Sequence, residues 1–161
     1  MPSNNNLEKL IKMSSSFVNE QYKGVVGVMV LNNLIIQDLE NHLSKFKLTY
    51  QQFNILRILK GQYPKGVQLS LIKERMLHKQ SYVSRLVDRL VTMEYVEKKE
   101  DELNKRRLHI RLTLKGFDLI NSIEVGSDSF KSLMKNLPEH DMLKFNEIIS
   151  TILAKKITSN S

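Results

Sequence analysis

The stretch SYVSRLVDRLVTMEYVEKKEDELNKRRLHIRL, residues 81–112, changes from one hydrophobic period to another, and this change decides the fold. Over residues 81–93 apolar side chains recur at steps of three and four, which predicts a helix with one buried face. Over residues 107–112 apolar side chains alternate with basic ones, which predicts a strand. Residues 95–99 are predicted to form the strand that pairs with it. The segment therefore ends in a hairpin with a polar, charged tip at residues 100–106.

Two shorter helices precede this segment. Thr49 and Gln52 have the spacing of a capping box, and the helix that follows is predicted to end at Gly61. After a turn at residues 63–66, apolar residues between 69 and 76 mark a second short helix. Three helices followed by a hairpin over residues 49–113 predict a winged helix-turn-helix DNA-binding lobe, whose third helix is the recognition candidate.

Long helices are predicted on both sides of the lobe. Residues 22–46 are apolar over a wider surface than one core face requires, which indicates burial on several sides. A last helix is predicted over residues 139–157, starting near Pro138, and another runs from Thr113 as far as Lys135. The fold class is thus mainly α with a small β-hairpin wing, with dimerisation helices in residues 1–48 and 114–161. A monomer with a large core of its own is the alternative.

Positive charge is concentrated in the lobe. The chain of 161 residues has a net charge of +8, and residues 49–113 carry 14 basic and 7 acidic residues. Such an excess in one segment favours a polyanionic partner. A solvated basic face is the alternative that charge alone leaves open.

Two groups of side chains are the candidates for contacting double-stranded DNA. A helix inserted into the major groove needs short polar side chains and an arginine near its start, whereas the alternative role of small polar residues there is helix capping. A basic hairpin tip can enter the minor groove or bind phosphates, although residues 100–102 are acidic. The recognition-helix candidates are Lys79, Gln80, Ser81, Tyr82, Ser84, Arg85 and Arg89, and the wing candidates are Lys105, Arg106 and Arg107.

Four motifs in and beside the lobe carry a resemblance. They are LTYQQFNIL at residues 48–56, SRLVDRL at 84–90, NKRR at 104–107 and LTLKG at 112–116. In order and spacing this resembles the MarR family of bacterial transcription regulators. The resemblance implies a homodimeric repressor that leaves a pseudo-palindromic operator when a small-molecule effector binds. It also implies that Arg106 reaches the minor groove, while Asn104 replaces the family's aspartate in the wing.

The resemblance further implies a small aromatic effector bound in a cleft between the dimer helices and the lobe. Met29, His42, Phe46 and Phe53 are the candidates for lining it. Each of them has an ordinary alternative role, which is to fill the core.

Other classes of protein have little support in the sequence. There is no cysteine, the four histidines lack ligand spacing, and no common catalytic motif occurs, so we expect no enzyme, cofactor or metal. No apolar run reaches roughly 18 residues and no secretory signal is visible, which predicts a cytoplasmic protein without a membrane span. A winged-helix module that coats DNA without sequence preference, or that binds a protein, is the alternative function.

Overall fold

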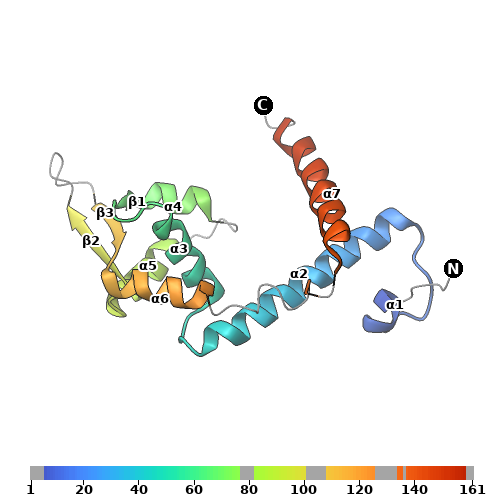
Figure 1. Ribbon diagram of the computed structural model, residues 1–161, viewed down its shortest axis with the longest axis horizontal. Coiled ribbons are helices and arrows are strands. Elements are labelled where there is room, and N and C mark those ends of the chain that lie inside the picture. The colour runs from blue at the N-terminus through green and yellow to red at the C-terminus, as the bar shows by residue number, and fades with distance from the viewer. Residues whose placement is uncertain (1–5, 77–81, 101–107, 126–133, 136, 159–161) are drawn as a thin grey trace. The chain divides into compact units, whose positions relative to one another are not determined.

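The computed structural model describes residues 6–76, 82–100, 108–125, 134–135 and 137–158 (Figure 1). The chain forms two units, residues 1–126 and residues 127–161. The first contains two N-terminal helices and the winged-helix lobe, and the second contains one long helix. None of the helices in the described ranges is both long and apolar enough to cross a membrane.

The long N-terminal helix begins and ends at recognisable caps. Helix α1 (Asn6–Leu10) precedes α2 (Glu20–Ser44), which the sequence placed two residues later. The Asn19 side chain accepts a hydrogen bond from the Tyr22 amide at 2.7 Å and so satisfies one free donor of the first turn. At the other end Lys47 takes a left-handed φ of 56°, and the Leu48 amide donates to the Leu43 carbonyl.

Three helices and a three-stranded sheet follow in the lobe (Figure 1). Helix α3 (Tyr50–Lys60) starts at the predicted capping box, since Thr49 and Gln52 exchange both hydrogen bonds. Helix α4 (Leu69–Arg75) comes next. The predicted recognition helix is α5 (Val83–Thr92), so its helical hydrogen bonding starts two residues after the predicted start and stops one residue before the predicted end.

The sheet is antiparallel, with strand order β1-β3-β2. Strands β2 (Val96–Glu100) and β3 (Leu108–Leu112) form the predicted hairpin, with Val96 opposite Leu112. Strand β1 (Val67–Gln68) was not predicted, because two residues are too few to show an alternating pattern. It pairs with β3 through Ile110 and His109.

Two further helices complete the chain. Helix α6 (Leu114–Val125) starts where predicted, since the Thr113 hydroxyl accepts a hydrogen bond from the Gly116 amide at 3.0 Å. The structure describes this helix as far as Val125, and most of its predicted continuation toward Lys135 falls on residues 126–133, which lie outside the described residues. In the second unit α7 (Glu139–Thr158) begins directly after Pro138.

Helix α3 lies at the centre of the hydrophobic core. Side chains from α2, α4, α5, α6 and the sheet join those of α3 in one buried cluster. Complete burial of each such leucine, isoleucine or phenylalanine contributes about 1.5–3 kcal/mol. The lobe therefore holds α5 and the hairpin on a rigid base. The buried side chains of this core include Leu43, Phe53, Leu56, Ile72, Val83, Val87, Leu90, Ile110, Ile120 and Ile123.

Candidate nucleic-acid interface

Helix α5 has one buried face and one exposed face. Val83, Val87 and Leu90 are buried in the core. Ser84 and Arg85 on the first turn are exposed, as the periodicity predicted. Since they are adjacent residues near the helix start, a hydroxyl and a guanidinium are available there to the edges of bases.

At the start of α5 the structure describes Tyr82 and the first turn of the helix. Tyr82 occupies the N-cap position and its side chain makes no capping hydrogen bond. The Tyr82 side chain is exposed, and so are Asp88 and Arg89 further along the helix. A helix start without a side-chain cap favours an anion such as a DNA phosphate. Three other candidates of this group, Lys79, Gln80 and Ser81, lie outside the described residues.

Two ion pairs organise the base of the wing. Asp88 on α5 pairs with Lys98 on β2, and Glu97 pairs with Arg111 directly opposite it on β3. The first pair joins α5 to strand β2 of the wing, and the second joins the two wing strands. The wing-tip candidates Lys105, Arg106 and Arg107, together with Asn104, lie outside the described residues.

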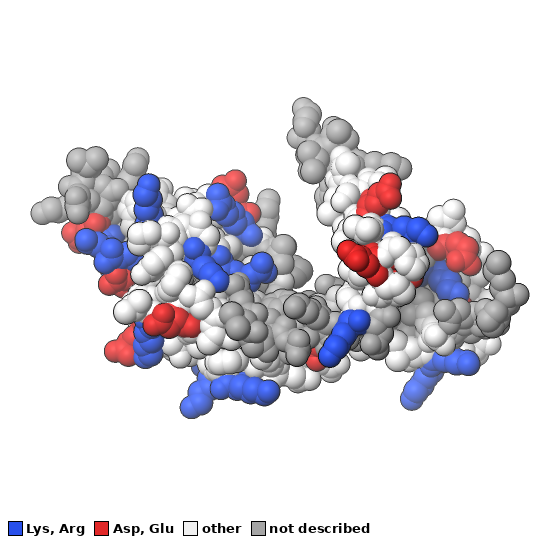
Figure 2. Space-filling model, in the orientation of Figure 1, with Lys and Arg blue, Asp and Glu red and all other residues white. Residues whose placement is uncertain are grey.

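These ion pairs also reduce the net positive charge at the base of the wing. Lys98 and Arg111 each have a carboxylate partner, so their charges are partly neutralised. In the view of Figure 2 basic and acidic groups lie side by side over the lobe. On this face the described part of the lobe carries both signs of charge, and the sequence adds the basic residues Lys105, Arg106 and Arg107 in the wing tip.

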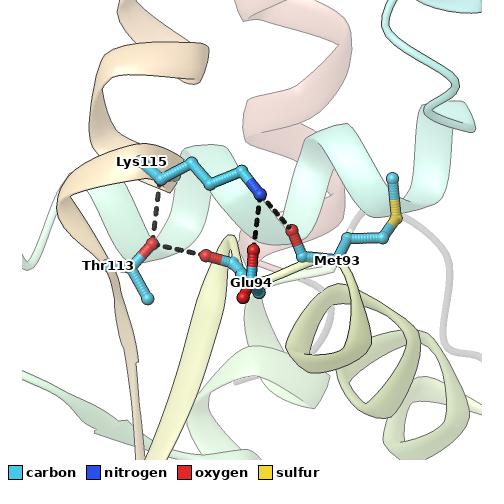
Figure 3. Close-up of polar contacts among 5 residues, drawn as sticks. Met93, Glu94, Thr113 and Lys115 are labelled. Atoms are coloured by element: carbon cyan, nitrogen blue, oxygen red, sulfur yellow. Dashed lines mark hydrogen bonds and ion pairs between the residues drawn. The ribbon is translucent and has the colours of Figure 1, made fainter.

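The turn that follows α5 is joined to the start of α6 (Figure 3). Lys115 Nζ lies 2.8 Å from Glu94 Oε2 and 3.2 Å from the Met93 carbonyl oxygen. The Thr113 hydroxyl donates to the Glu94 carbonyl at 2.7 Å. The hydrogen bond from Lys115 lowers the pKa of the Glu94 carboxyl, and the same bond raises the pKa of Lys115.

Sequence reasoning did not find this junction. Glu94 and Lys115 are separated by 21 residues, so no local pattern connects them. The LTLKG motif contains Thr113 and Lys115, but it was interpreted only as part of the family resemblance. The signal that could have found the junction is a lysine two residues after a helix-capping threonine, close to the end of a hairpin.

The four candidates for an effector cleft do not lie together. His42 lies on the last turn of α2 and Phe46 just beyond the end of that helix, and their ring centroids are 5.6 Å apart. Phe46 is half-buried and packs against the core to which the fully buried Phe53 belongs. Met29 is 62% exposed, and since it precedes His42 by 13 residues on the same helix it lies roughly 20 Å away.

His42 has one further property of interest. Its Nε2 atom is buried and has no hydrogen-bond partner among the described residues. No three histidine, aspartate or glutamate side chains in those same residues gather closely enough to hold a metal ion.

Comparison with known proteins finds similarity in sequence to one transcription regulator and in fold to several solved structures. A sequence model described as "MarR family" matches residues 46–107. The HTH-type transcriptional regulator PecS of Dickeya dadantii (strain 3937) is 30% identical over 101 residues, which is 62% of this chain and 61% of PecS. This chain thus spans about three fifths of the length of that curated relative.

Solved structures share the fold. A mutant MarR from E. coli in complex with operator DNA superimposes with a TM-score of 0.74 at 23% identity, covering 86% of this chain and 99% of that one. The S. aureus MepR–DNA complex gives a TM-score of 0.70 at 18% identity, covering 87% and 99%. At these identities the likeness shows the fold alone.

Proposed function

We propose that this chain is a homodimeric repressor of the MarR family that binds a pseudo-palindromic operator in the cytoplasm, and the match of residues 46–107 to a MarR-family sequence model supports this proposal. A small-molecule effector releases it. The family is one of transcription regulators and not of enzymes.

One observation carries this proposal. On α5 three apolar side chains are buried in the core, while Ser84 and Arg85 are exposed on the first turn. An arginine there has the geometry to donate two hydrogen bonds to a guanine edge. Two structures with the same fold hold DNA, which supports the placement of α5 in the major groove.

Exposed apolar side chains support dimerisation. On α2 the side chains of Val25, Val28 and Met29 are more than half exposed, and on α7 so are those of Leu143 and Ile152. Exposed apolar surface of this extent is costly in water and marks a surface for a partner. Light scattering at micromolar concentration should give a particle of twice 18.8 kDa. A stable particle of 18.8 kDa would contradict the dimer.

The experiment that tests the function begins with selection of bound duplexes from a random pool. A sequence-specific repressor should prefer the selected duplex over a scrambled one by at least ~10³, and its affinity should fall steeply with salt. Equal affinity for both duplexes would show a protein that coats DNA. Absence of binding at low salt would favour a protein-binding module.

We place the effector near His42 and Phe46. Their rings lie against each other, and the buried Nε2 of His42 is available to a polar group of a small aromatic ligand. A ligand that binds there should raise the melting temperature and release the protein from the selected duplex. The substitution His42→Phe keeps an aromatic ring but removes the nitrogen, so it should abolish the response while DNA binding stays. An unchanged response would exclude this site.

A further inference from the structure

The turn between α5 and β2 has an unfavourable backbone conformation. Glu94 has a φ of 63°, in the left-handed region that favours glycine and is costly for residues with a Cβ atom. Two hydrogen bonds close the end of α5 at this turn, from the Glu94 amide to the Val91 carbonyl and from the Tyr95 amide to the Leu90 carbonyl. The conformation of the turn after α5 therefore depends on contacts that hold Glu94 in place.

Those contacts come from the start of α6. Besides its contacts with Glu94 and Met93, the Lys115 ammonium lies 5.2 Å from the centre of the Tyr95 ring. Thr113 adds two bonds, one from its hydroxyl to the Glu94 carbonyl and one from its amide to the Tyr95 carbonyl at 3.1 Å. Figure 3 shows Thr113 and Lys115 approaching the turn together. All three residues of the turn, Met93–Tyr95, are thus held.

The turn lies at one end of α5, and the candidate base-reading side chains lie at the other end. Ten residues of α-helix rise roughly 15 Å, so a tilt of about 10° at the turn would move Ser84 by roughly 2.5 Å. Hydrogen bonds to base edges tolerate less than this. The Asp88–Lys98 pair connects α5 to β2, which leaves the same turn, so the wing would be displaced too.

We propose that Lys115 is a positioning residue for DNA recognition, which acts through the Glu94 turn and not by contact with DNA. From the first turn of α6 it holds the left-handed conformation of Glu94, and this fixes the direction of α5 and the wing. The inference rests on the proposed function, because it assumes that α5 reads DNA.

Three substitutions separate the roles that Lys115 can have. Lys115→Met removes the ammonium group but keeps a long apolar side chain, and Lys115→Arg keeps the charge. Glu94→Gly gives the turn a residue that adopts a positive φ without support. Circular dichroism first establishes that each variant is folded at the assay temperature. Binding to the selected and the scrambled duplex is then measured over a range of salt concentrations.

Lys115→Met should lower affinity for the selected duplex about fivefold. It should change affinity for the scrambled duplex by less than roughly twofold and leave the salt slope unchanged. Lys115→Arg keeps the charge and should bind the selected duplex with the affinity of the wild type. In the Glu94→Gly background Lys115→Met should cost less than about twofold, because the turn no longer needs the lysine.

Three results would overturn the inference. Equal losses on both duplexes, with a salt slope reduced by about 0.9, would show that Lys115 binds a phosphate. An equal loss with and without Glu94→Gly would show that Lys115 does not act through the turn. Unchanged affinity in Lys115→Met would show that it has no role in binding.

A measurement without DNA keeps this inference separate from the proposed function. Hydrogen exchange at the Glu94 and Tyr95 amides reports on the turn alone. Exchange should be faster in Lys115→Met and should return to the wild-type rate in Lys115→Arg. Unchanged exchange would overturn the inference even in a protein that binds DNA specifically. A wild-type protein that prefers no duplex, but shows the exchange effect, would overturn the proposed function and leave Lys115 as the residue that holds the turn.

Discussion

Replacement of Gly116 by alanine should destabilise the lobe, because α6 and the turn after α5 approach each other too closely for a side chain. A Cβ atom on Gly116 would lie 2.0 Å from the Tyr95 carbonyl oxygen and 2.8 Å from the carbonyl carbon. Ordinary contact starts at 3.4 Å, so about 1.4 Å of space is missing. The obstacle is backbone and cannot rotate away, so α6 itself must move.

The cost of this movement follows from what α6 contacts. Ile120 and Ile123 are completely buried, and the Thr113 amide donates to the same Tyr95 carbonyl. Forcing excess volume into a packed site costs about 1–3 kcal/mol. Loss of the Thr113 hydrogen bond adds roughly 1 kcal/mol. At about 2–4 °C per kcal/mol for a protein of this size, the melting temperature should fall by roughly 5–15 °C.

Thermal unfolding followed by circular dichroism measures this effect, and Gly61→Ala is the matched control. A Cβ atom on Gly61 would lie 3.6 Å from the nearest atom, and Gly61 has a φ of −63° that alanine adopts freely. The control should change stability by less than about 0.5 kcal/mol. A melting temperature of Gly116→Ala that equals the control would refute the close approach on which the reasoning depends.

Three further predictions concern DNA contact, helix capping and pH. Arg85→Ala should cost about 1–3 kcal/mol of binding free energy and relax base preference, whereas Lys105→Ala should weaken binding to all duplexes alike. Gel-shift titrations distinguish the two effects. Unchanged operator preference in Arg85→Ala would contradict the assignment of α5 as the helix that reads bases. Thr49→Ala should destabilise α3 by about 1 kcal/mol in urea unfolding, and Thr49→Ser should not. The pKa of Glu94 is lowered from 4.5 and that of Lys115 is raised from 10.5. Their ion pair should therefore contribute its full stabilisation of the folded protein between pH 4.5 and pH 10.5. This stabilisation should be lost as the pH falls through the lowered pKa of Glu94 or rises through the raised pKa of Lys115. Melting curves of wild type and Lys115→Met over pH should therefore converge at both extremes.

Local features of the lobe could be predicted from the sequence because they depend on residues close together in the chain. The capping box of Thr49 and Gln52 needs three residues of separation, and the structure contains both of its hydrogen bonds. The buried face of α5 follows from the helical period, and Val83, Val87 and Leu90 lie on it.

Features that depend on distant residues could not be predicted. Strand β1 exists only because β3 provides a partner for Val67 and Gln68. The left-handed turn at Glu94 contains no glycine that would have signalled it. Its lysine partner comes from the far side of the hairpin. For the same reason the four effector candidates, chosen by residue type, are spread over α2, the turn after it and α3, and do not form one group.

The two residues of β1 have a consequence for which edge of the sheet is left unpaired. Strand β3 is the central strand, with β1 on one side and β2 on the other. Strand β2 is therefore an edge strand of the sheet. Glu97, Lys98, Lys99 and Glu100 give this edge four charged side chains in succession. Charged edge strands resist pairing with strands of other molecules and so prevent aggregation through the sheet. In the proposed dimer, contact between copies would then be made by the apolar helices and not by the sheet.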